Sequence, residues 1–355
     1  MNISVSTIFK NILVLMLNFC LSIKFIVMKL LVIDSKVIDE IIDYKYAIDV
    51  VEEAFKNKEI YGVELPPRQE ITLDAPQRFY GSMAAYLHGY NIIGVKLITY
   101  FFENPELYGI PPLYAFVSIF DGIKGVPLAI VEGTKVTTFR TGAMGAVSSK
   151  YLAVKTPSVI GLIGAGIQGR MQLHMHLTLY PGVDRVLVYD ALKDRAVSLI
   201  NEFSEQYDIE FKSVDDVNEL VSKSDILITA TTSVKPVLDG KYLKEGAHIV
   251  SIGYVNKDSR ELDDNSMARA SKIYVDSKDA YSSGDIRIPL EKGVIHKSKV
   301  VGELSQVIVG RIVGRESDKE VTIFKSVGTA ILDAAMAYKI YLKAVEEGEG
   351  KYIEL

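Results

Sequence analysis

The stretch Val159-Ile-Gly-Leu-Ile-Gly-Ala-Gly-Ile-Gln-Gly-Arg170 decides the fold. Its apolar first half predicts a buried β-strand, and glycines with the spacing G-x-G-x-x-G follow, ahead of a helix-compatible segment. Gly164 permits a tight turn, Gly166 lets the backbone approach a pyrophosphate, and Gly169 lets the helix pack against the strand. The helix N-terminus then offers free N–H groups and the positive end of its dipole to the anion. We therefore predict a dinucleotide-binding turn.

The next apolar run, residues 185–189, ends at Asp190, 26 residues after Gly164. An acid at about this distance accepts hydrogen bonds from the ribose hydroxyls and repels a 2′-phosphate, so the sequence favours NAD(H) as the cofactor. Lys193 and Arg195 leave NADP(H) open, because cations at this place could bind a 2′-phosphate. Both also fit as solvated charges on the next helix.

Length and composition bound the class of protein. The chain has 355 residues, 48% apolar and 24% charged, which fits a globular protein with two domains. A net charge of −5 argues against a nucleic-acid partner. Cys20 is the only cysteine, so an intramolecular disulfide is excluded and a cytoplasmic location is expected. The spacings of the five histidines predict no metal site.

Residues 1–27 differ from the rest of the chain. Apolar residues dominate from 11 to 27, but Asn18 and Lys24 interrupt them, no basic segment precedes them, and no small-x-small cleavage site follows. Met28-Lys-Leu-Leu-Val-Ile-Asp34 reads like a natural start, a short strand entering a helix. We expect residues 1–27 to be a start-site extension, with a disordered or apolar leader (a signal or anchor) as the alternative. No stable membrane association is expected.

The pattern of apolar runs predicts an α/β protein of two domains. The second is a Rossmann-type doubly wound parallel sheet over residues 154–314, with strands at 159–163, 186–189, 225–230, 248–252 and 272–276. The first is an α+β domain for substrate binding and dimerisation, formed by residues 28–153 and 315–355. It combines helices within 37–58, a twisted antiparallel sheet over 62–130, and a helix over 140–153. A long helix beyond residue 326 should return to this domain, with no further strand to cover.

Three isolated cations in the first domain are candidates for chemistry: Arg68, Lys96 and Arg140. Lys96 lies within the apolar run 92–98, so its ammonium needs an anionic partner if the side chain faces inward. An outward, snorkelling lysine is the alternative.

The order of several motifs resembles the ornithine cyclodeaminase/mu-crystallin family. The matching residues are Pro67-Arg68, Met83 with Tyr86-Leu87, Gly94-Val95-Lys96, Arg140-Thr-Gly-Ala143, Gly164-Ala-Gly-Ile-Gln168, Thr229-Ala-Thr-Thr-Ser233, Arg260-Glu-Leu-Asp263, Gly302-Glu-Leu304 and Phe324-Lys-Ser-Val-Gly328.

This resemblance implies a homodimer whose sheet domain holds substrate and whose Rossmann domain holds cofactor. It implies that Arg68 and Lys96 bind the carboxylate of a small imino or amino acid beside Met83. It also implies that Lys96 and Arg140 are catalytic, with Arg140 between substrate and cofactor. The residues implied at the dinucleotide are Arg140, Thr141, Gly164, Gly166, Gln168, Gly169, Asp190, Thr231, Ile252 and Gly253.

Two departures from the family pattern bear on the reaction. Ornithine-cyclising members have an Asp where this chain has Val255 and a Glu where it has Gly81; Asp258 could substitute only if the loop folds differently. Reducing a preformed cyclic ketimine needs no base to activate water. We therefore predict an NAD(P)-dependent oxidoreductase acting on the C–N bond of a small α-imino or α-amino acid. Alanine dehydrogenase and ornithine cyclodeaminase activities are the alternatives, and a non-catalytic dinucleotide-dependent binding protein is the alternative from another class.

Overall fold

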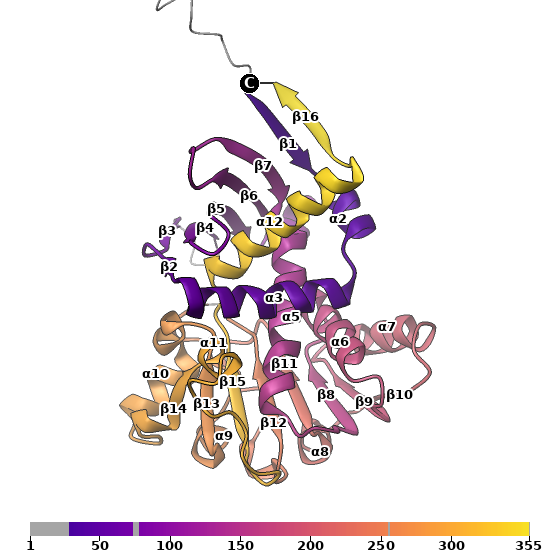
Figure 1. Ribbon diagram of the computed structural model, residues 1–355. Coiled ribbons are helices and arrows are strands. Elements are labelled where there is room, and N and C mark those ends of the chain that lie inside the picture. The colour runs from indigo at the N-terminus through magenta and orange to yellow at the C-terminus, as the bar shows by residue number, and fades with distance from the viewer. Residues whose placement is uncertain (1–27, 74–77, 255, 355) are drawn as a thin grey trace, which may run out of the picture.

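The computed structural model describes residues 28–73, 78–254 and 256–354, so the expectation for residues 1–27 lies outside the described residues. This part of the chain forms two eight-stranded sheets, one above the other in Figure 1. Helix α12 crosses the first sheet, α3 lies between the two sheets, and α5 runs from the first sheet down to the second. No helix in these ranges is long and apolar enough to cross a membrane.

The first sheet has the strand order β16-β1-β7-β6-β5-β4-β2, and β3 pairs with β4. All neighbours are antiparallel except β1 and β7. The strands are β1 (Lys29–Ile33), β2 (Val63–Glu64), β3 (Gln69–Thr72), β4 (Arg78–Leu87), β5 (Ile92–Phe101), β6 (Leu113–Asp121), β7 (Pro127–Glu132) and β16 (Lys351–Glu354). The helices of this half are α2 (Ser35–Ile41), α3 (Tyr44–Tyr61), α4 (Asn104–Tyr108), α5 (Gly133–Leu152) and α12 (Ala330–Glu347).

A close contact fixes α12 on this sheet. A Cβ added at Gly94 in β5 would lie 2.4 Å from the Cβ of Ala334, so only glycine allows this approach. Because side chains alternate along a strand, Lys96 faces the same helix two residues after Gly94. Asp333, the residue before Ala334, is thereby brought over Lys96. The predicted return of the C-terminal helix to the first domain is confirmed.

The second sheet has the order β10-β9-β8-β11-β12-β15-β13-β14, and every neighbouring pair is parallel. The strands are β8 (Val159–Ile163), β9 (Arg185–Tyr189), β10 (Glu210–Ser213), β11 (Ile226–Thr229), β12 (His248–Ser251), β13 (Lys272–Val275), β14 (Val300–Glu303) and β15 (Thr322–Lys325). The order reverses between β8 and β11, which is where doubly wound sheets bind ligands. The predicted Rossmann-type fold is confirmed.

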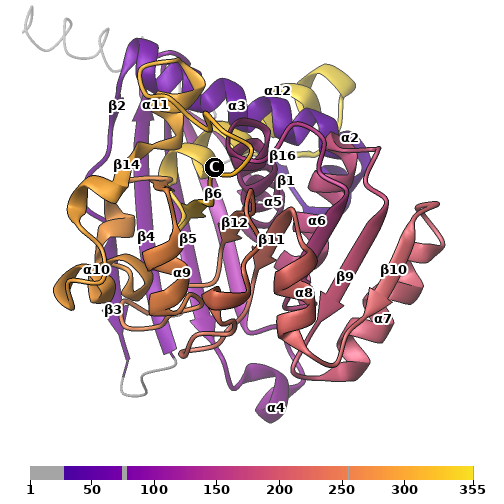
Figure 2. The same ribbon diagram turned by 90° about the horizontal axis from the view of Figure 1, so that it is seen from below.

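Helices accompany both edges of this sheet. Figure 2 shows α7 beside β10 at one edge and α10 near β14 at the other. The α-helices of this half are α6 (Ile167–Leu179), α7 (Lys193–Ser204), α8 (Val217–Lys223), α9 (Asp264–Arg269), α10 (Gly284–Glu291) and α11 (Leu304–Ile308), and the short 3-10 helices are η1 (Gly240–Tyr242), η2 (Lys278–Ser282) and η3 (Lys297–Lys299).

Two sequence predictions about the C-terminal part are wrong. The domain boundary expected at 314/315 is too early, because β15 lies within the second sheet, between β12 and β13. The expectation of no further strand also fails, since β16 follows α12 and pairs with β1. Both strands are four residues long, and a segment this short shows no reliable hydrophobic period.

Candidate active site

The glycine turn between β8 and α6 has the geometry of a phosphate-binding turn. Gly164 has a φ of +103°, which L-residues with side chains rarely adopt. A Cβ at Gly169 would lie 1.9 Å from the Gly164 carbonyl oxygen, so this glycine lets the helix approach the turn. Gly166 caps α6, and nothing lies within 4 Å of the place where its Cβ would be. That open space at a helix N-terminus fits a pyrophosphate.

A second observation agrees with a dinucleotide at this turn. Within the described residues, Gln168 Oε1 is buried and has no hydrogen-bond partner, which suits a donor from a ligand. Asp190 follows β9 and accepts hydrogen bonds from Ala165 N and Leu192 N, both at 2.8 Å. Its carboxylate is therefore held against the glycine turn, where a ribose hydroxyl can reach it. The residues present fit a nicotinamide dinucleotide.

Lys193 and Arg195, the cations that left NADP(H) as an alternative, both lie on the exposed side of α7. The Lys193 ammonium pairs with Asp215 at 2.7 Å on the exposed surface of α7. Arg195 is exposed two residues further along the same helix.

Helix α5 connects the glycine turn to the first domain. The Glu132 carboxylate accepts hydrogen bonds from Thr134 N and Lys135 N and so caps this helix. Further along, Gln172 of α6 donates to the carbonyl of Thr141 at 2.9 Å, which holds α5 against α6. Thr141 itself is buried in this contact. Arg140, one residue earlier, faces a cleft between the two domains.

This cleft has a volume of about 990 Å³ and brings together residues that are far apart in sequence. Of the predicted site residues, Arg68, Met83, Lys96, Arg140 and Thr231 line it. Thr141, Asp190 and the glycine turn lie outside its lining, along the second domain, and Ile252 and Gly253 directly follow β12. Apolar side chains of the first sheet make up much of the opposite wall: Phe79, Ile98, Tyr100, Phe102 and Leu113.

A buried acid that the sequence analysis did not name joins the two candidate catalytic cations. Asp333 Oδ2 lies 2.8 Å from Lys96 Nζ, and Asp333 Oδ1 accepts from Arg140 Nε at 2.9 Å. The Lys96 and Asp333 side chains are 2% and 1% exposed. The inward orientation of Lys96 is thereby established, and the snorkelling alternative is excluded.

Burial and charge set the protonation of this cluster. Burial lowers the pKa of Lys96 to about 8, and Arg140 adds to that effect while Asp333 opposes it. Burial by itself would raise the pKa of Asp333, but the charges of Arg140 and Lys96 outweigh it and hold that pKa below its usual value. An ammonium with a pKa near 8 is able to lose its proton close to neutral pH.

Arg68 stands at the mouth of the cleft. Its guanidinium donates to the Gly328 carbonyl at 3.1 Å and lies 3.4 Å from Asp279 and 3.9 Å from Glu70. The loop that carries Gly328 is fixed by the buried carboxylate of Asp276, which accepts from Gly328 N at 2.7 Å. Arg68 is thus positioned by backbone at the edge of the space that Lys96 and Arg140 enclose.

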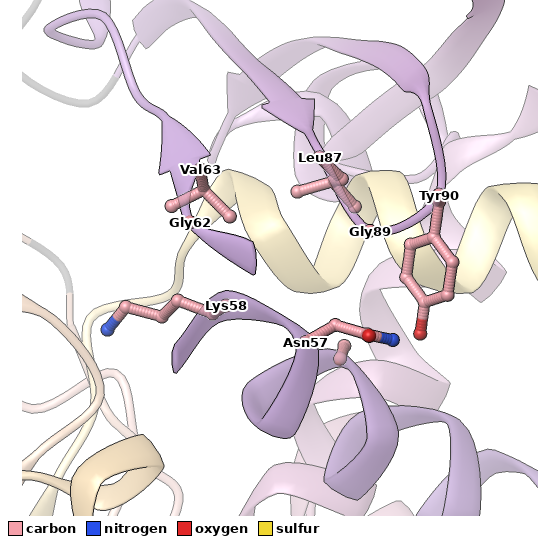
Figure 3. Close-up of a pocket in the computed structure, with 8 residues that line it drawn as sticks. Asn57, Lys58, Gly62, Val63, Leu87, Gly89 and Tyr90 are labelled. Atoms are coloured by element: carbon pink, nitrogen blue, oxygen red, sulfur yellow. The ribbon is translucent and has the colours of Figure 1, made fainter. Parts of the chain in front are cut away.

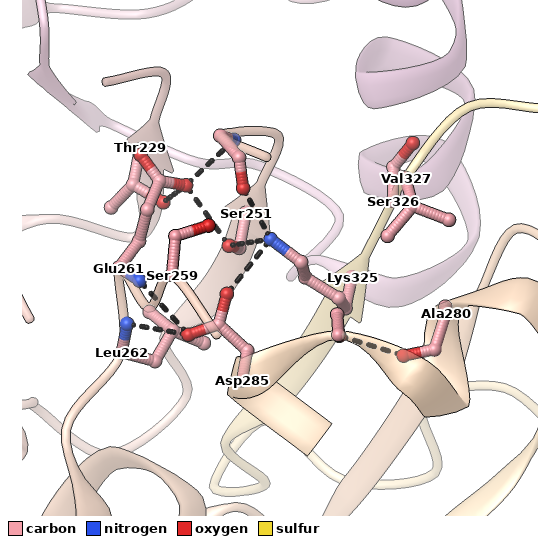
Figure 4. A network of polar contacts seen from close by, with 12 residues as sticks. Thr229, Ser251, Ser259, Glu261, Leu262, Ala280, Asp285, Lys325, Ser326 and Val327 are labelled. Carbon is pink, nitrogen blue, oxygen red and sulfur yellow. Dashed lines mark hydrogen bonds and ion pairs between the residues drawn. The ribbon is translucent and has the colours of Figure 1, made fainter. Parts of the chain in front are cut away.

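Figure 4 shows a polar network, and this network reaches the cleft through Thr231, which lines it. The carboxylate of Glu261 accepts five hydrogen bonds, from Thr229 Oγ1, Thr231 N, Thr231 Oγ1, Ser251 Oγ and Gly253 N, at 2.7 to 3.0 Å. It therefore ties the end of β11 to the end of β12. Sequence reasoning quoted Glu261 within a motif but assigned it no role.

Lys325 completes this network from β15. Its ammonium donates to the Gly253 carbonyl at 2.6 Å and to Ser251 Oγ at 3.2 Å, and it lies 2.8 Å from Asp285. The other oxygen of Asp285 accepts from Glu261 N and Leu262 N. All three ionic side chains of the network are buried.

Asp258, the acid considered as a substitute in ornithine chemistry, does not line the cleft. Asp258 pairs with Arg287 at 2.5 Å and is exposed, so it does not substitute for a water-activating acid. Gly81 lines the cleft with Glu70 opposite it in β3, but that carboxylate lies beside Arg68. Val255 lies outside the described residues.

A second hollow and the histidines of the described chain offer no comparable site. The hollow at the end of α3 in Figure 3, lined by Asn57, Lys58 and Tyr90, has about 0 Å³ that a water molecule could occupy. In the described ranges, no group of three or more His, Cys, Asp or Glu side chains is arranged to hold a metal ion. His174 instead stacks on Tyr44, and burial lowers its pKa to about 4.

Comparison with known proteins agrees with this site. The model of the ornithine cyclodeaminase/mu-crystallin family matches residues 28–348. A delta(1)-pyrroline-2-carboxylate reductase of Bacillus cereus is 33% identical over 274 residues, 77% of this chain and 83% of that protein. The structure of Thermococcus litoralis delta(1)-pyrroline-2-carboxylate reductase with NADH and L-proline is 38% identical, with a TM-score of 0.86 over 91% of this chain and 99% of that one. An archaeal alanine dehydrogenase dimer with bound NAD is 32% identical, with a TM-score of 0.86 over 92% of this chain and 100% of that one.

The fold, the glycine turn and the cationic cleft, with these relatives, define an NAD(H)-dependent oxidoreductase acting on the C–N bond of a small α-imino or α-amino acid. The family model covers most of the chain, and relatives of this identity align along nearly their whole length. The chain belongs to the ornithine cyclodeaminase/mu-crystallin family.

Proposed function

We propose that this protein reduces a cyclic α-imino acid, a ketimine carboxylate, to the corresponding cyclic amino acid. One observation carries the choice among family reactions: the acids that line the cleft, among the described residues, are Glu70 and Asp279, and both lie beside Arg68. Both carboxylates are more than half exposed, and they contact Arg68 rather than Lys96 or Arg140, where we place the reacting imine. Forming or hydrolysing an imine needs a base to activate water, whereas reducing a preformed cyclic imine does not.

In this proposal the bound dinucleotide supplies a hydride to the imine carbon. Arg68 and Lys96 bind the substrate carboxylate, with about 1.5–3 kcal/mol for each well-made charged hydrogen bond. The Lys96 ammonium is paired with Asp333 at 2.8 Å and donates to Thr137 Oγ1 at 3.4 Å, and a group with three N–H donors can also donate to the substrate. That ammonium is also the proton donor for the imine nitrogen. Arg140 is held by Asp333 beside the reacting carbon.

A substrate screen tests the proposal. We expect NADH oxidation with pyrroline-2-carboxylate or piperideine-2-carboxylate to be at least about tenfold faster, in kcat/KM, than with pyruvate and ammonia. Ornithine should release no ammonia. Faster turnover of pyruvate with ammonia would make the protein an alanine dehydrogenase, and absence of turnover with every substrate would favour the non-catalytic alternative.

We propose NAD(H) rather than NADP(H) as the working cofactor, because Asp190 lies against the glycine turn and Lys193 is paired with Asp215. Asp190→Ser removes a charge and a ribose acceptor. It should weaken NADH binding about tenfold and change the preference in favour of NADPH. Lys193→Met is the matched control and should leave both affinities unchanged. A wild type that binds NADPH more tightly than NADH would contradict this assignment.

We further propose a cytoplasmic homodimer that joins the outer face of the first sheet. The alternate side chains of β5 and β6, those that point away from α12, are mostly apolar and only partly buried; Tyr114 and Phe116 are 49% and 41% exposed. A face of this kind needs a cover. The archaeal relative described as a dimer supports this arrangement. A monomeric mass in sedimentation analysis would contradict it.

A further inference from the structure

The buried network of Glu261, Asp285 and Lys325 lies on the second-domain side of the cleft, which we call the cofactor wall. It carries an excess negative charge. It contains two carboxylates, Glu261 and Asp285, and one ammonium, Lys325. The neighbouring cation, Arg260, contacts none of these three side chains and is paired at 2.7 Å with Asp264, which also binds the exposed Lys292. One anionic charge in the network is therefore left without a cationic partner.

The hydrogen bonds place this charge on Glu261. Lys325 donates to Ser251 Oγ, so the Ser251 hydroxyl hydrogen is directed to Glu261. Two backbone N–H groups and two threonine hydroxyls occupy the other positions around the carboxylate. A carboxylate surrounded by donors is stabilised in its charged form.

Glu261 lies one layer beneath the cleft wall. It bonds to Thr231, which lines the cleft, and to Gly253, whose neighbour Tyr254 lines it too. These residues follow β11 and β12, at the carboxyl ends of strands beyond the switch point of the sheet. The Lys96–Arg140 pair lines the same cleft from the first domain. The cleft thus has a cationic substrate wall and an anionic layer beneath its cofactor wall.

We propose that Glu261 is a positioning residue whose buried charge makes the cofactor wall electronegative and shifts dinucleotide binding toward the oxidised form. A nicotinamide ring is positively charged when oxidised and neutral when reduced, and a nearby anion in a low-dielectric setting stabilises only the former. This charge makes the bound reduced cofactor a stronger reductant. This proposal rests on the binding of a dinucleotide in the second domain, but it does not depend on which imine is reduced.

The test compares the dissociation constants of NAD⁺ and NADH in the full chain, measured by fluorescence titration and competition. Glu261→Gln keeps the shape of the side chain and removes its charge. We expect the ratio Kd(NAD⁺)/Kd(NADH) to rise about tenfold, or about 1.4 kcal/mol. Lys325→Met removes the compensating cation and should lower the same ratio. If Glu261→Gln does not fold, as judged by thermal unfolding, Lys325→Met alone decides.

Glu52→Gln is the matched control. Glu52 is a buried carboxylate on α3 with three donors, Lys56, Lys150 and Tyr151, away from the cleft. Its replacement should leave the ratio unchanged. A purely structural Glu261 would weaken both forms by the same factor, and that result, or a ratio that moves in the same direction in both cleft variants, overturns the proposal. If both dinucleotides bind as expected but no imine is reduced, the proposed reaction fails and this inference stands.

Discussion

Lys96→Met should lower kcat/KM for a cyclic α-imino acid by about a hundredfold or more while leaving the Kd of NADH within about twofold of wild type. Methionine keeps the aliphatic stem of this buried side chain and removes only the ammonium, so Asp333 retains its bond to Arg140. The loss combines one charged hydrogen bond to the carboxylate, about 1.5–3 kcal/mol, with the proton donor, typically worth about 10²–10⁴-fold. Lys96 lies on β5 of the first domain, and the glycine turn lies in the second domain outside the lining of the cleft, so dinucleotide binding should survive.

The control for this prediction is Lys150→Met. Lys150 also pairs with a buried carboxylate, Glu52 at 2.6 Å, and lies on α5 away from the cleft. It should alter stability but not turnover. Steady-state kinetics and NADH titration on both variants separate the two roles, and wild-type kinetics in Lys96→Met would remove this residue from the mechanism.

The sequence predicts the second domain well because its signals are local. The glycines of the turn and the buried strand before it lie within twelve residues, and the inner strands β8 and β11 are almost continuously apolar, as in a covered parallel sheet. The edge strands β10 and β14 contain polar or charged residues and were not predicted. Strand β15 escapes this reasoning because its four residues end in Lys325 and Ser326 follows directly, a pair that reads as a polar loop. Those polar side chains are buried only because β15 lies between β12 and β13, where Ser251 and Asp276 bind them.

The site is less predictable because its charges are paired across long distances in the chain. The sequence indicates that an inward Lys96 needs an anion, but Asp333 lies 237 residues later, within a helix that reads only as amphipathic. The contact depends on the close approach of α12 to Gly94, which no local pattern specifies. Asp333 was nevertheless the one acid between residues 321 and 345, and that isolation in an apolar helix was the signal available.

The role of Glu261 has a similar origin. Its five donors come from the ends of two different strands, and three of the five bonds are made by residues that the sequence gives only as neighbours of the cofactor, Thr231 and Gly253. A buried acid can be inferred from sequence only where its partners can be inferred too. Backbone N–H groups in turns do not depend on residue type, so the sequence gives no sign of them.

Asp333→Asn should shift the pH dependence of turnover to lower pH. In the wild type, kcat/KM is expected to fall as pH rises through about 8, because Lys96 then loses its proton. The neutral amine can neither pair with the substrate carboxylate as a cation nor protonate the imine nitrogen. The Asp333 charge raises the pKa of Lys96, while burial and Arg140 lower it. Removing that charge leaves only the effects that lower the pKa of Lys96. The fall of kcat/KM on the alkaline side of the pH profile, the alkaline limb, must therefore move to lower pH. A shift of about one pH unit corresponds to about 1.4 kcal/mol.

This variant therefore loses more activity at pH 8 than at pH 6, in contrast to a residue that only supports packing. Asparagine keeps the size of the side chain and an oxygen that can still accept from Arg140 Nε or from Lys96 Nζ. Full pH profiles of kcat/KM, with the Kd of NADH measured at each pH, separate the outcomes. A uniformly slower enzyme with its limb still near pH 8 would assign Asp333 to packing alone, whereas a displaced limb with unchanged NADH affinity would establish that it controls the proton on Lys96.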